Sequence, residues 1–131
     1  MNLTEKLNTF ESEKINKVLP VNKTVEVTVF NVSKQLNKNN KENICFQVQT
    51  AENNTYNVKY LVDARFENAM MYSLAEMKKI CSKFNLSTNN WNTIDDVVAT
   101  LQNVAGKKLF IRKNKKLINN IETTEIKFVL E

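Results

Sequence analysis

The sequence predicts an α+β fold that is mainly β: a five-stranded barrel with two helices inserted between the third and fourth strands. Three observations indicate this fold. Apolar and polar residues alternate with period two in five segments, which is typical of half-buried strands. Apolar residues at helical spacing are concentrated in the middle of the chain. The length of 131 residues, with 42% hydrophobic and 25% charged side chains, is that of one globular domain with a real core.

Residues 1–20 are expected to form an N-terminal arm or short helix, followed by the barrel domain over residues 21–131. Leu3, Leu7 and Phe10 fit one helical face, and Pro20 ends the segment because the residue before a proline is pushed out of the helical region. The first residues lack the apolar stretch of a signal peptide, and no apolar run approaches the length of a membrane span. We therefore expect a cytoplasmic protein with no membrane partner.

Three strands are predicted next, over residues 24–32, 44–50 and 56–62. In each, β-branched or aromatic residues alternate with polar ones, as in Val25, Val27 and Val29 of the first segment. Residues 51–55 form a tight hairpin loop, and residues 33–42 form a longer polar loop. The three strands should pair as an antiparallel meander.

Two helices are predicted in the middle of the chain. Ser73 and Glu76 have the spacing of a capping box and begin a helix that runs to about Asn85. Thr93 is the expected N-cap of the second helix, and Gly106 has the position of a C-terminal glycine cap. The apolar stripes consist of Leu74, Met77, Ile80, Cys81 and Phe84 in the first helix, and Ile94, Val97, Val98, Leu101 and Val104 in the second.

The chain then returns to strands, predicted over residues 108–112 and 125–131, with a basic loop between them. Segment 117–121 fits either an extension of this hairpin or a packed loop. In the fourth strand, Lys108, Phe110 and Arg112 share one face, and Leu109 and Ile111 share the other.

Composition argues against an enzyme, a metal site or a cofactor. The chain has no histidine, which is the usual general base near neutral pH and the commonest metal ligand. Its one glycine excludes a glycine-rich phosphate-binding loop. Asp95 and Asp96 fall in the first turn of a helix, where the helix dipole favours negative charge. Cys45 and Cys81 lie in apolar segments and are expected to be buried free thiols.

The order of three strands, a helical insert and two strands matches the oligonucleotide/oligosaccharide-binding (OB) fold. Ligands of that fold lie across strands 2 and 3, between the loop that joins strands 1 and 2 and the loop that joins strands 4 and 5. Both loops are lysine-rich here, and the net charge of +5 suits a polyanion. The first loop carries Lys34, Lys38 and Lys41, the second carries Lys113, Lys115 and Lys116, and the third strand offers Lys59.

These features predict non-sequence-specific binding of single-stranded DNA through a basic and aromatic groove. Phe110, between Lys108 and Arg112, is the strongest stacking candidate. Tyr56 and Tyr60 are weaker candidates because their strand face is otherwise apolar, and Trp91 either stacks on a base or packs over the second helix. Lys107 completes the set of candidate site residues. The alternative for residues 107–116 is a solvated edge strand whose lysines prevent aggregation.

The chain also resembles a phage-encoded family of single-stranded-DNA-binding proteins with an OB fold, often described only as a domain of unknown function. The resemblance covers roughly residues 10–130 and rests on the order of patterns. Two departures are the turn Val21-Asn-Lys23, where the family usually has a glycine, and the second helix. The matching segments are Val18-Leu-Pro20 with Val25-Glu-Val-Thr-Val29, Phe46-Gln-Val-Gln49, Tyr56-Asn-Val-Lys-Tyr60, the helix from Leu74 to Phe84, and Leu101 followed by Gly106-Lys-Lys-Leu109.

This resemblance implies a role in phage DNA replication or recombination, within the host cytoplasm. RNA, a replication or recombination protein and a second copy of the chain are further partners that the sequence leaves open. A different class of function is a protein-interaction module, such as a phage inhibitor of a host nuclease or polymerase, whose cationic face meets an acidic surface of the host protein.

Overall fold

The described residues of the computed structural model, 19–130, form five antiparallel strands and two helices. Most of the expected N-terminal arm, residues 1–20, lies outside them. Both helices lie between β3 and β4, so the predicted two-helix insert in a mainly β fold is confirmed. The elements are β1 (Thr24–Leu36), β2 (Glu42–Gln49), β3 (Thr55–Leu61), α2 (Glu67–Lys83), α3 (Ile94–Leu101), a 3-10 turn η1 (Gln102–Val104), β4 (Lys108–Ile118) and β5 (Ile121–Phe128).

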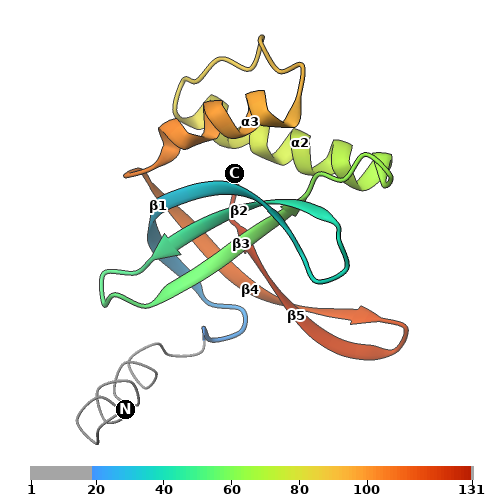
Figure 1. The fold of residues 1–131 in the computed structure, drawn as a ribbon. Coiled ribbons are helices and arrows are strands. Elements are labelled where there is room, and N and C mark those ends of the chain that lie inside the picture. Colours follow the sequence, from blue (N-terminus) through green and yellow to red (C-terminus); the bar gives the residue numbers. More distant parts are fainter. Residues whose placement is uncertain (1–18, 131) are drawn as a thin grey trace, which may run out of the picture.

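The five strands make one sheet in the order β3-β2-β1-β4-β5, with every neighbouring pair antiparallel. The sheet curls into a half-barrel (Figure 1), which brings its two edge strands, β3 and β5, into contact. No ladder of hydrogen bonds joins these two edges within residues 19–130, and we call this line the seam. The helices α2 and α3 lie together over one end of the half-barrel.

The core fills the inside of the half-barrel and the space beneath the helices. Alternate residues of each strand point inward, as the period-two pattern predicts. Each large apolar side chain that is fully buried contributes about 1.5–3 kcal/mol. The core includes Val27, Val29, Ile44, Phe46, Val48, Val58, Tyr60, Leu109, Ile111 and Phe128 from the strands, and Met77, Ile80, Cys81, Val97 and Leu101 from the helices. Cys45 and Cys81 are buried free thiols, as expected.

Three aromatic rings meet across the seam. Phe46 of β2 makes edge-to-face contacts with Tyr60 of β3 at 5.7 Å and with Phe128 of β5 at 5.1 Å between ring centroids. Tyr60 and Phe128 stack at 6.4 Å. Such pairs are worth about 0.5–1.5 kcal/mol beyond the burial of their area. The aromatic trio of Phe46, Tyr60 and Phe128 therefore holds β5 against β3 where backbone pairing is missing.

The hairpin of β1 and β2 is longer than predicted. The two strands pair as far as Leu36 and Glu42, so the expected loop over residues 33–42 shrinks to a turn over residues 37–41. Beyond the core both strands are polar, and the hydrophobic alternation that marks a strand in the sequence is lost there. A register shift between Val29 and Asn31 also breaks the alternation, because it inserts a β-bulge at Phe30.

The capping box predicted at Ser73 and Glu76 is wrong. Helix α2 begins at Glu67, with Phe66 at the N-cap position and no side-chain cap, so Ser73 lies inside the helix. Met70 packs on the core one turn before Leu74, which extends the apolar face toward the N-terminus. Ser73 and Glu76 have the spacing of a capping box, but the helical spacing of apolar residues begins before them, and so does the helix.

The predicted start of the second helix is confirmed. The Thr93 hydroxyl accepts a hydrogen bond from the Asp96 backbone N–H at 3.2 Å, and the Asp96 carboxylate accepts one from the Thr93 N–H at 2.9 Å. Gly106 does not cap this helix, because η1 intervenes. It lies in the turn before β4 with φ of 86°, and its N–H donates to the Val29 carbonyl at 2.7 Å.

The basic loop predicted after residue 112 is instead part of a long hairpin. Strand β4 continues to Ile118, and Asn119 and Asn120 turn the chain into β5. Both asparagines have positive φ, 51° and 65°, which a two-residue hairpin turn of type I′ requires. The hairpin projects beyond the half-barrel (Figure 1), and the predicted loop lysines lie on a strand with alternating faces. No described helix is both long and apolar enough to cross a bilayer.

Replacing Tyr60 with phenylalanine tests how the aromatic trio stabilises the fold. The Tyr60 hydroxyl is buried and has no hydrogen-bond partner within residues 19–130. Burial raises its pKa, and the negative charge of the nearby Glu76 carboxylate raises it further. Because an unsatisfied buried hydroxyl costs about 1–3 kcal/mol, Tyr60→Phe should leave stability to urea unchanged or raise it. Phe128→Ala should lose about 3–5 kcal/mol in the same measurement. A large loss in Tyr60→Phe would show that the hydroxyl, rather than the ring, matters.

Candidate nucleic-acid interface

The outer face of β1, β2 and β3 is polar and rich in amides. The strand register aligns Asn31, Gln47 and Asn57 in one row across the three strands, and the Asn31 side chain donates to the Gln47 carbonyl oxygen at 2.8 Å. The next row is Ser33, Cys45 and Lys59. Amides and hydroxyls can donate to phosphate and to base edges without preference for one sequence. Lys59 gives this face its positive charge.

A hollow opens where this face meets the seam. It is lined by Asn57 and Lys59 of β3, Lys113 of β4, and residues 124–127 of β5, including Glu125 and Lys127. Three lysines therefore face one glutamate. Lys59 and Lys113 have no ion-pair partner in the described part of the chain, whereas Lys127 lies 3.7 Å from Glu125. We call this feature the seam hollow; its unpaired ammonium groups suit an anion such as a phosphate.

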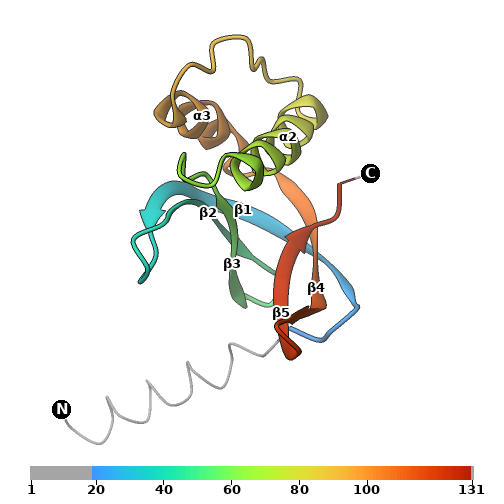
Figure 2. The ribbon, with the colours of Figure 1, turned by 90° about the vertical axis from the view of Figure 1, so that its right-hand side faces the viewer.

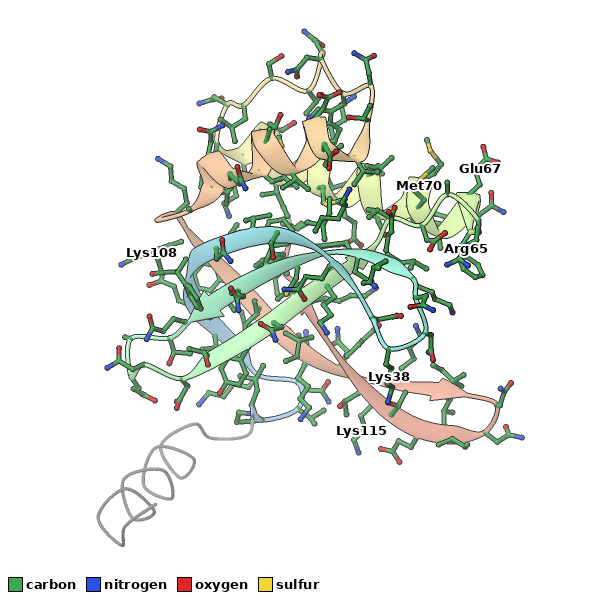
Figure 3. All side chains as sticks on the ribbon, in the orientation of Figure 1. Lys38, Arg65, Glu67, Met70, Lys108 and Lys115 are labelled. Atoms are coloured by element: carbon green, nitrogen blue, oxygen red, sulfur yellow. The ribbon has the colours of Figure 1, made fainter. Side chains whose placement is uncertain are left out.

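Two projecting segments flank β3 on either side. Figure 2 shows β3 between the turn that joins β1 and β2 and the hairpin of β4 and β5. The turn carries Lys38 and Lys41, and the hairpin carries Lys115 and Lys116. Lys38 is exposed, and Figure 3 shows it and Lys115 on the same side of the molecule. The flanking segments could therefore guide an extended polyanion toward the seam hollow.

A buried carboxylate fixes the turn between β1 and β2. Asp63, which follows β3, accepts hydrogen bonds from the Arg65 guanidinium at 2.7 and 2.9 Å and from the Glu42 backbone N–H at 3.1 Å. Arg65 also donates to the Asn40 carbonyl at 2.8 Å. The adjacent guanidinium holds the pKa of the Asp63 carboxyl well below its usual range. The turn is thus held in place without a ligand.

Neither Lys34 nor Lys41 is as free as the sequence suggested. Lys34 lies on β1 rather than in a loop, and its Nζ is 2.9 Å from the Asp95 carboxylate of α3. It therefore ties the sheet to the helical layer, away from the seam hollow. Lys41 remains in the turn, with its ammonium 4.7 Å from the centroid of the Phe66 ring, a cation–π arrangement.

The basic segment 107–116 is divided between different faces of the sheet. Lys108, Phe110 and Arg112 share the outer face of β4, as predicted, beside β1. There Phe110 lies opposite Glu26, and Lys108 lies 3.8 Å from the Glu26 carboxylate. Lys113 instead turns into the seam hollow. Because β1 separates β4 from β2 and β3, the structure does not bring Phe110 together with Lys59.

The remaining basic residues of this segment lie at its two ends. Lys107 is exposed in the turn before β4. Lys115 lies 3.1 Å from Glu122, and Lys116 lies 3.6 Å from Glu125, so glutamates of β5 partly neutralise the hairpin. Figure 3 shows Lys108 on the opposite side of the molecule from Lys38 and Lys115.

The predicted aromatic residues do not line the seam hollow. Tyr60 is in the core, Tyr56 is half-buried against it, and Trp91 lies in the helical layer, where its Nε1 donates to the Thr100 hydroxyl at 3.0 Å. The sequence reasoning missed Phe30, which is 47% exposed at the β-bulge, immediately before Asn31. Val29 and Val32 on either side of the bulge are buried, whereas Phe30 and Asn31 between them are exposed, so both lie on the outer face.

No family model matches the chain, and no curated protein matches it significantly. Among the described residues, no group of three or more histidine, cysteine, aspartate or glutamate side chains lies close enough to hold a metal ion. The site is therefore interpreted from its own residues: a cationic hollow at the seam of a curled sheet, beside a polar amide-rich face.

Replacing Asp63 with asparagine tests the anchored turn. Because its folded-state pKa is depressed, the Asp63 carboxylate stabilises the fold above its unfolded pKa of about 4 and loses this effect as pH falls through the folded value. Asp63→Asn should have a lower Tm than the wild type at pH 7. The difference in Tm between the two proteins should shrink as pH falls toward 2. Asp95→Asn is the control, since its carboxylate is mostly exposed and should change the Tm little. Equal Tm values for wild type and Asp63→Asn at pH 7 would contradict the anchor.

Proposed function

We propose that the protein has an OB fold and binds single-stranded DNA without sequence specificity, through a path that crosses β2 and β3 and enters the seam hollow. The order of the strands, the partly open barrel and the two segments that flank β3 all agree with the way that OB folds bind oligonucleotides. A role in phage DNA replication or recombination follows from the sequence resemblance alone and is part of the same proposal.

One observation carries this proposal: the seam hollow gathers Lys59, Lys113 and Lys127 from three different strands. Two of these lysines, Lys59 and Lys113, have no ion-pair partner among residues 19–130, where six salt bridges form, one of them between Lys127 and Glu125 in the hollow itself. Leaving cations unpaired and close together is unfavourable unless an anion joins them. The neighbouring amides of Asn57 and Gln47 extend the polar surface along the path.

Phosphate contacts should supply most of the affinity. No aromatic ring of residues 19–130 lines the seam hollow, and lysine acts on a phosphate as a point charge. Phe30 is an exposed ring beside the amide row, and it offers a stacking platform at the side of the path. Binding should therefore depend steeply on salt and little on base identity.

The central test is a titration of fluorescently labelled oligo-dT, followed by anisotropy at 50 and 200 mM salt. Replacing Lys59, Lys113 and Lys127 together with glutamine should weaken binding at least about tenfold at 50 mM salt and flatten the log–log salt dependence by about 2, since each contact contributes about 0.7 to the slope for single strands. The matched control replaces Lys78, Lys79 and Lys83 on α2 with glutamine, which changes the net charge equally.

The control variant should bind within about threefold of the wild type, because its lysines lie on the helical layer. Equal losses of affinity in the two variants would mean that net charge alone attracts the DNA, and would contradict a binding site at the seam hollow. No binding by the wild type at 50 mM salt would reject the proposed function and favour a protein-interaction module.

Two aromatic substitutions test which part of the outer face of the sheet binds the DNA. Phe30→Ala should weaken oligo-dT binding at least about fivefold, since one stacked base contributes about 1–3 kcal/mol. Phe110→Ala should change it less than about twofold, because Phe110 lies beside β1 and Glu26, on the strand farther from β2 and β3. Their rings are similarly exposed, 47% and 42%, so each serves as the control for the other. The reverse order of effects would place the path over β4.

Binding should also be insensitive to pH between about 6 and 8. The chain contains no histidine, the side chain that ordinarily titrates in this range, and burial raises the pKa of both cysteine thiols. Anisotropy titrations at pH 6 and pH 8 in equal ionic strength should therefore give the same Kd. A change beyond about threefold would reveal a titrating group that the interpretation of the site lacks.

A further inference from the structure

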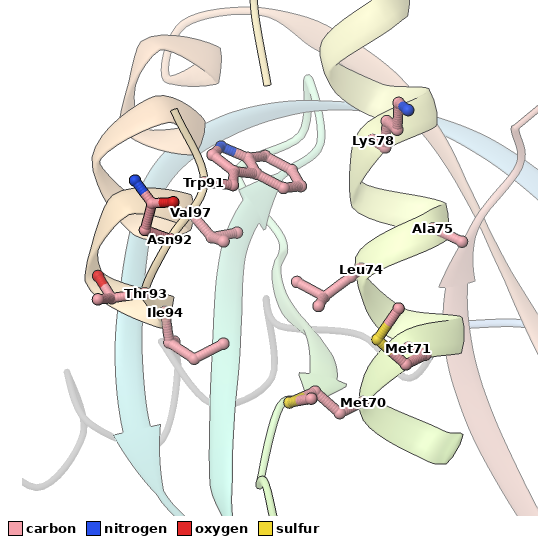
Figure 4. A pocket seen from close by; sticks show the side chains of 10 residues that line it. All are labelled: Met70, Met71, Leu74, Ala75, Lys78, Trp91, Asn92, Thr93, Ile94 and Val97. Carbon is pink, nitrogen blue, oxygen red and sulfur yellow. The ribbon is translucent and has the colours of Figure 1, made fainter. Parts of the chain in front are cut away.

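An apolar groove lies between α2 and α3, at the end of the molecule away from the projecting hairpin (Figure 1). Its volume is about 560 Å³, which is room for several side chains. Figure 4 shows the side chains that line it converging from the two helices and from the segment before α3. The apolar lining residues are Met70, Met71, Leu74, Trp91, Ile94 and Val97.

The fold itself does not require so apolar a surface. Val97 belongs to the core beneath the groove, but Met70, Leu74, Trp91 and Ile94 are only half-buried, and Met71 is 55% exposed. A connected group of exposed apolar residues on a small domain commonly marks a site of association. Methionine is well suited to such a site, because its flexible and polarisable side chain adapts to the surface of a partner.

The charges beside the groove define the partner further. Lys78 lines the groove and also an adjoining hollow on the other side of α2, together with Lys79 and Lys83. None of these three lysines has an ion-pair partner within residues 19–130. Ala75, like Lys78, lines both the groove and the hollow, so the two features are continuous along α2.

The acidic side chains of α3 are already engaged. Asp95 pairs with Lys34 of β1, and Asp96 accepts hydrogen bonds from the N–H groups of Asn92 and Thr93 at the start of its own helix. The lysine row on α2 therefore has no acidic counterpart on the neighbouring helix. An apolar groove with one cationic rim is complementary to an apolar surface with one acidic flank.

We propose that this groove binds an amphipathic, acidic α-helix of another protein. The apolar face of that helix would lie between α2 and α3 against Met71, Leu74 and Trp91, and its carboxylates would meet Lys78, Lys79 and Lys83. This is helix-in-groove recognition, in which anchors at positions i, i+3, i+4 and i+7 fill a preformed groove. The groove and the seam hollow share no lining residue, so a nucleic acid and a protein helix can bind at once.

Trp91 is the single tryptophan of the chain and lines the groove, so its fluorescence reports occupancy directly. The probe is a synthetic helical peptide of about 14 residues with leucines along one face and glutamates along one flank. Its titration into the full-length protein should shift the Trp91 emission to shorter wavelength. A peptide of the same composition with scattered leucines, and one with lysines in place of glutamates, should each bind at least about tenfold more weakly.

Paired variants on α2 test the location. Met71→Glu should weaken the acidic peptide at least about tenfold, because it puts a negative charge into the groove. Tyr72→Glu is the matched control: Tyr72 is 78% exposed on the same helix but does not line the groove, and its variant should bind within about twofold of the wild type. Both positions are exposed, so folding should survive either change, and circular dichroism checks this.

The variant that replaces Lys78, Lys79 and Lys83 with glutamine completes the test. It should lose the preference for the acidic peptide over the peptide with lysines in place of glutamates, while it keeps oligo-dT binding. Equal affinity for all three peptides, or equal effects of Met71→Glu and Tyr72→Glu, would overturn the proposal. So would dimerisation that Met71→Glu abolishes in sedimentation velocity, since the occupant would then be a second copy of the chain. A shift of the Trp91 emission on removal of residues 1–17 would also overturn the proposal, since the occupant of the groove would then be the N-terminal segment of the same chain.

Discussion

The contact between the rings of Phe46, Tyr60 and Phe128 is the constraint on which the rest of the structure depends. Antiparallel pairing fixes every other pair of neighbouring strands, but over the described residues β3 and β5 meet without a ladder of hydrogen bonds. Their separation is set by side-chain packing inside the half-barrel. Because the seam hollow is built from residues of β3 on one side and of β4 and β5 on the other, its width is set by the same three rings. The packing of the core and the geometry of the seam hollow therefore depend on the same three ring contacts.

The charges follow from this geometry rather than from the basic run in the sequence. Strand alternation sends Lys113 inward to the seam and Arg112 outward beside β1, although the two are adjacent in the chain. Glutamates of β5 neutralise part of the hairpin, and Asp95 binds Lys34. Two cations without an ion pair, Lys59 and Lys113, meet in the seam hollow, and three more form the row on α2. Each group is next to a different kind of surface, one polar and one apolar.

The sequence predicted the order of elements well, because five alternating segments and one amphipathic region each carry a local signal. It predicted their ends poorly where the signal is absent. The last residues of β1, from Ser33 to Gln35, are polar, so the strand continues to Leu36 without hydrophobic alternation. Helix α2 begins before Ser73 because its apolar face extends toward the N-terminus beyond this residue. The site was only partly predictable. Lys127 could have been predicted, because Ile126 and Phe128 on either side of it have the pattern of core residues and alternation then places Lys127 on the other face. The contact between β3 and β5 could not, because it is a long-range contact that no local pattern encodes.

Asparagine, rather than glycine, makes the turns of this chain. In the described part of the chain six asparagines have positive φ, at positions 22, 40, 53, 85, 119 and 120, whereas Gly106 is the single glycine of the sequence. Asparagine tolerates the left-handed conformation better than other residues with a side chain. It also leaves the unfolded chain fewer conformations than glycine does, so less entropy is lost when each turn forms. Part of the stability of the turns thus originates in the unfolded ensemble, and a count of native contacts would not detect it.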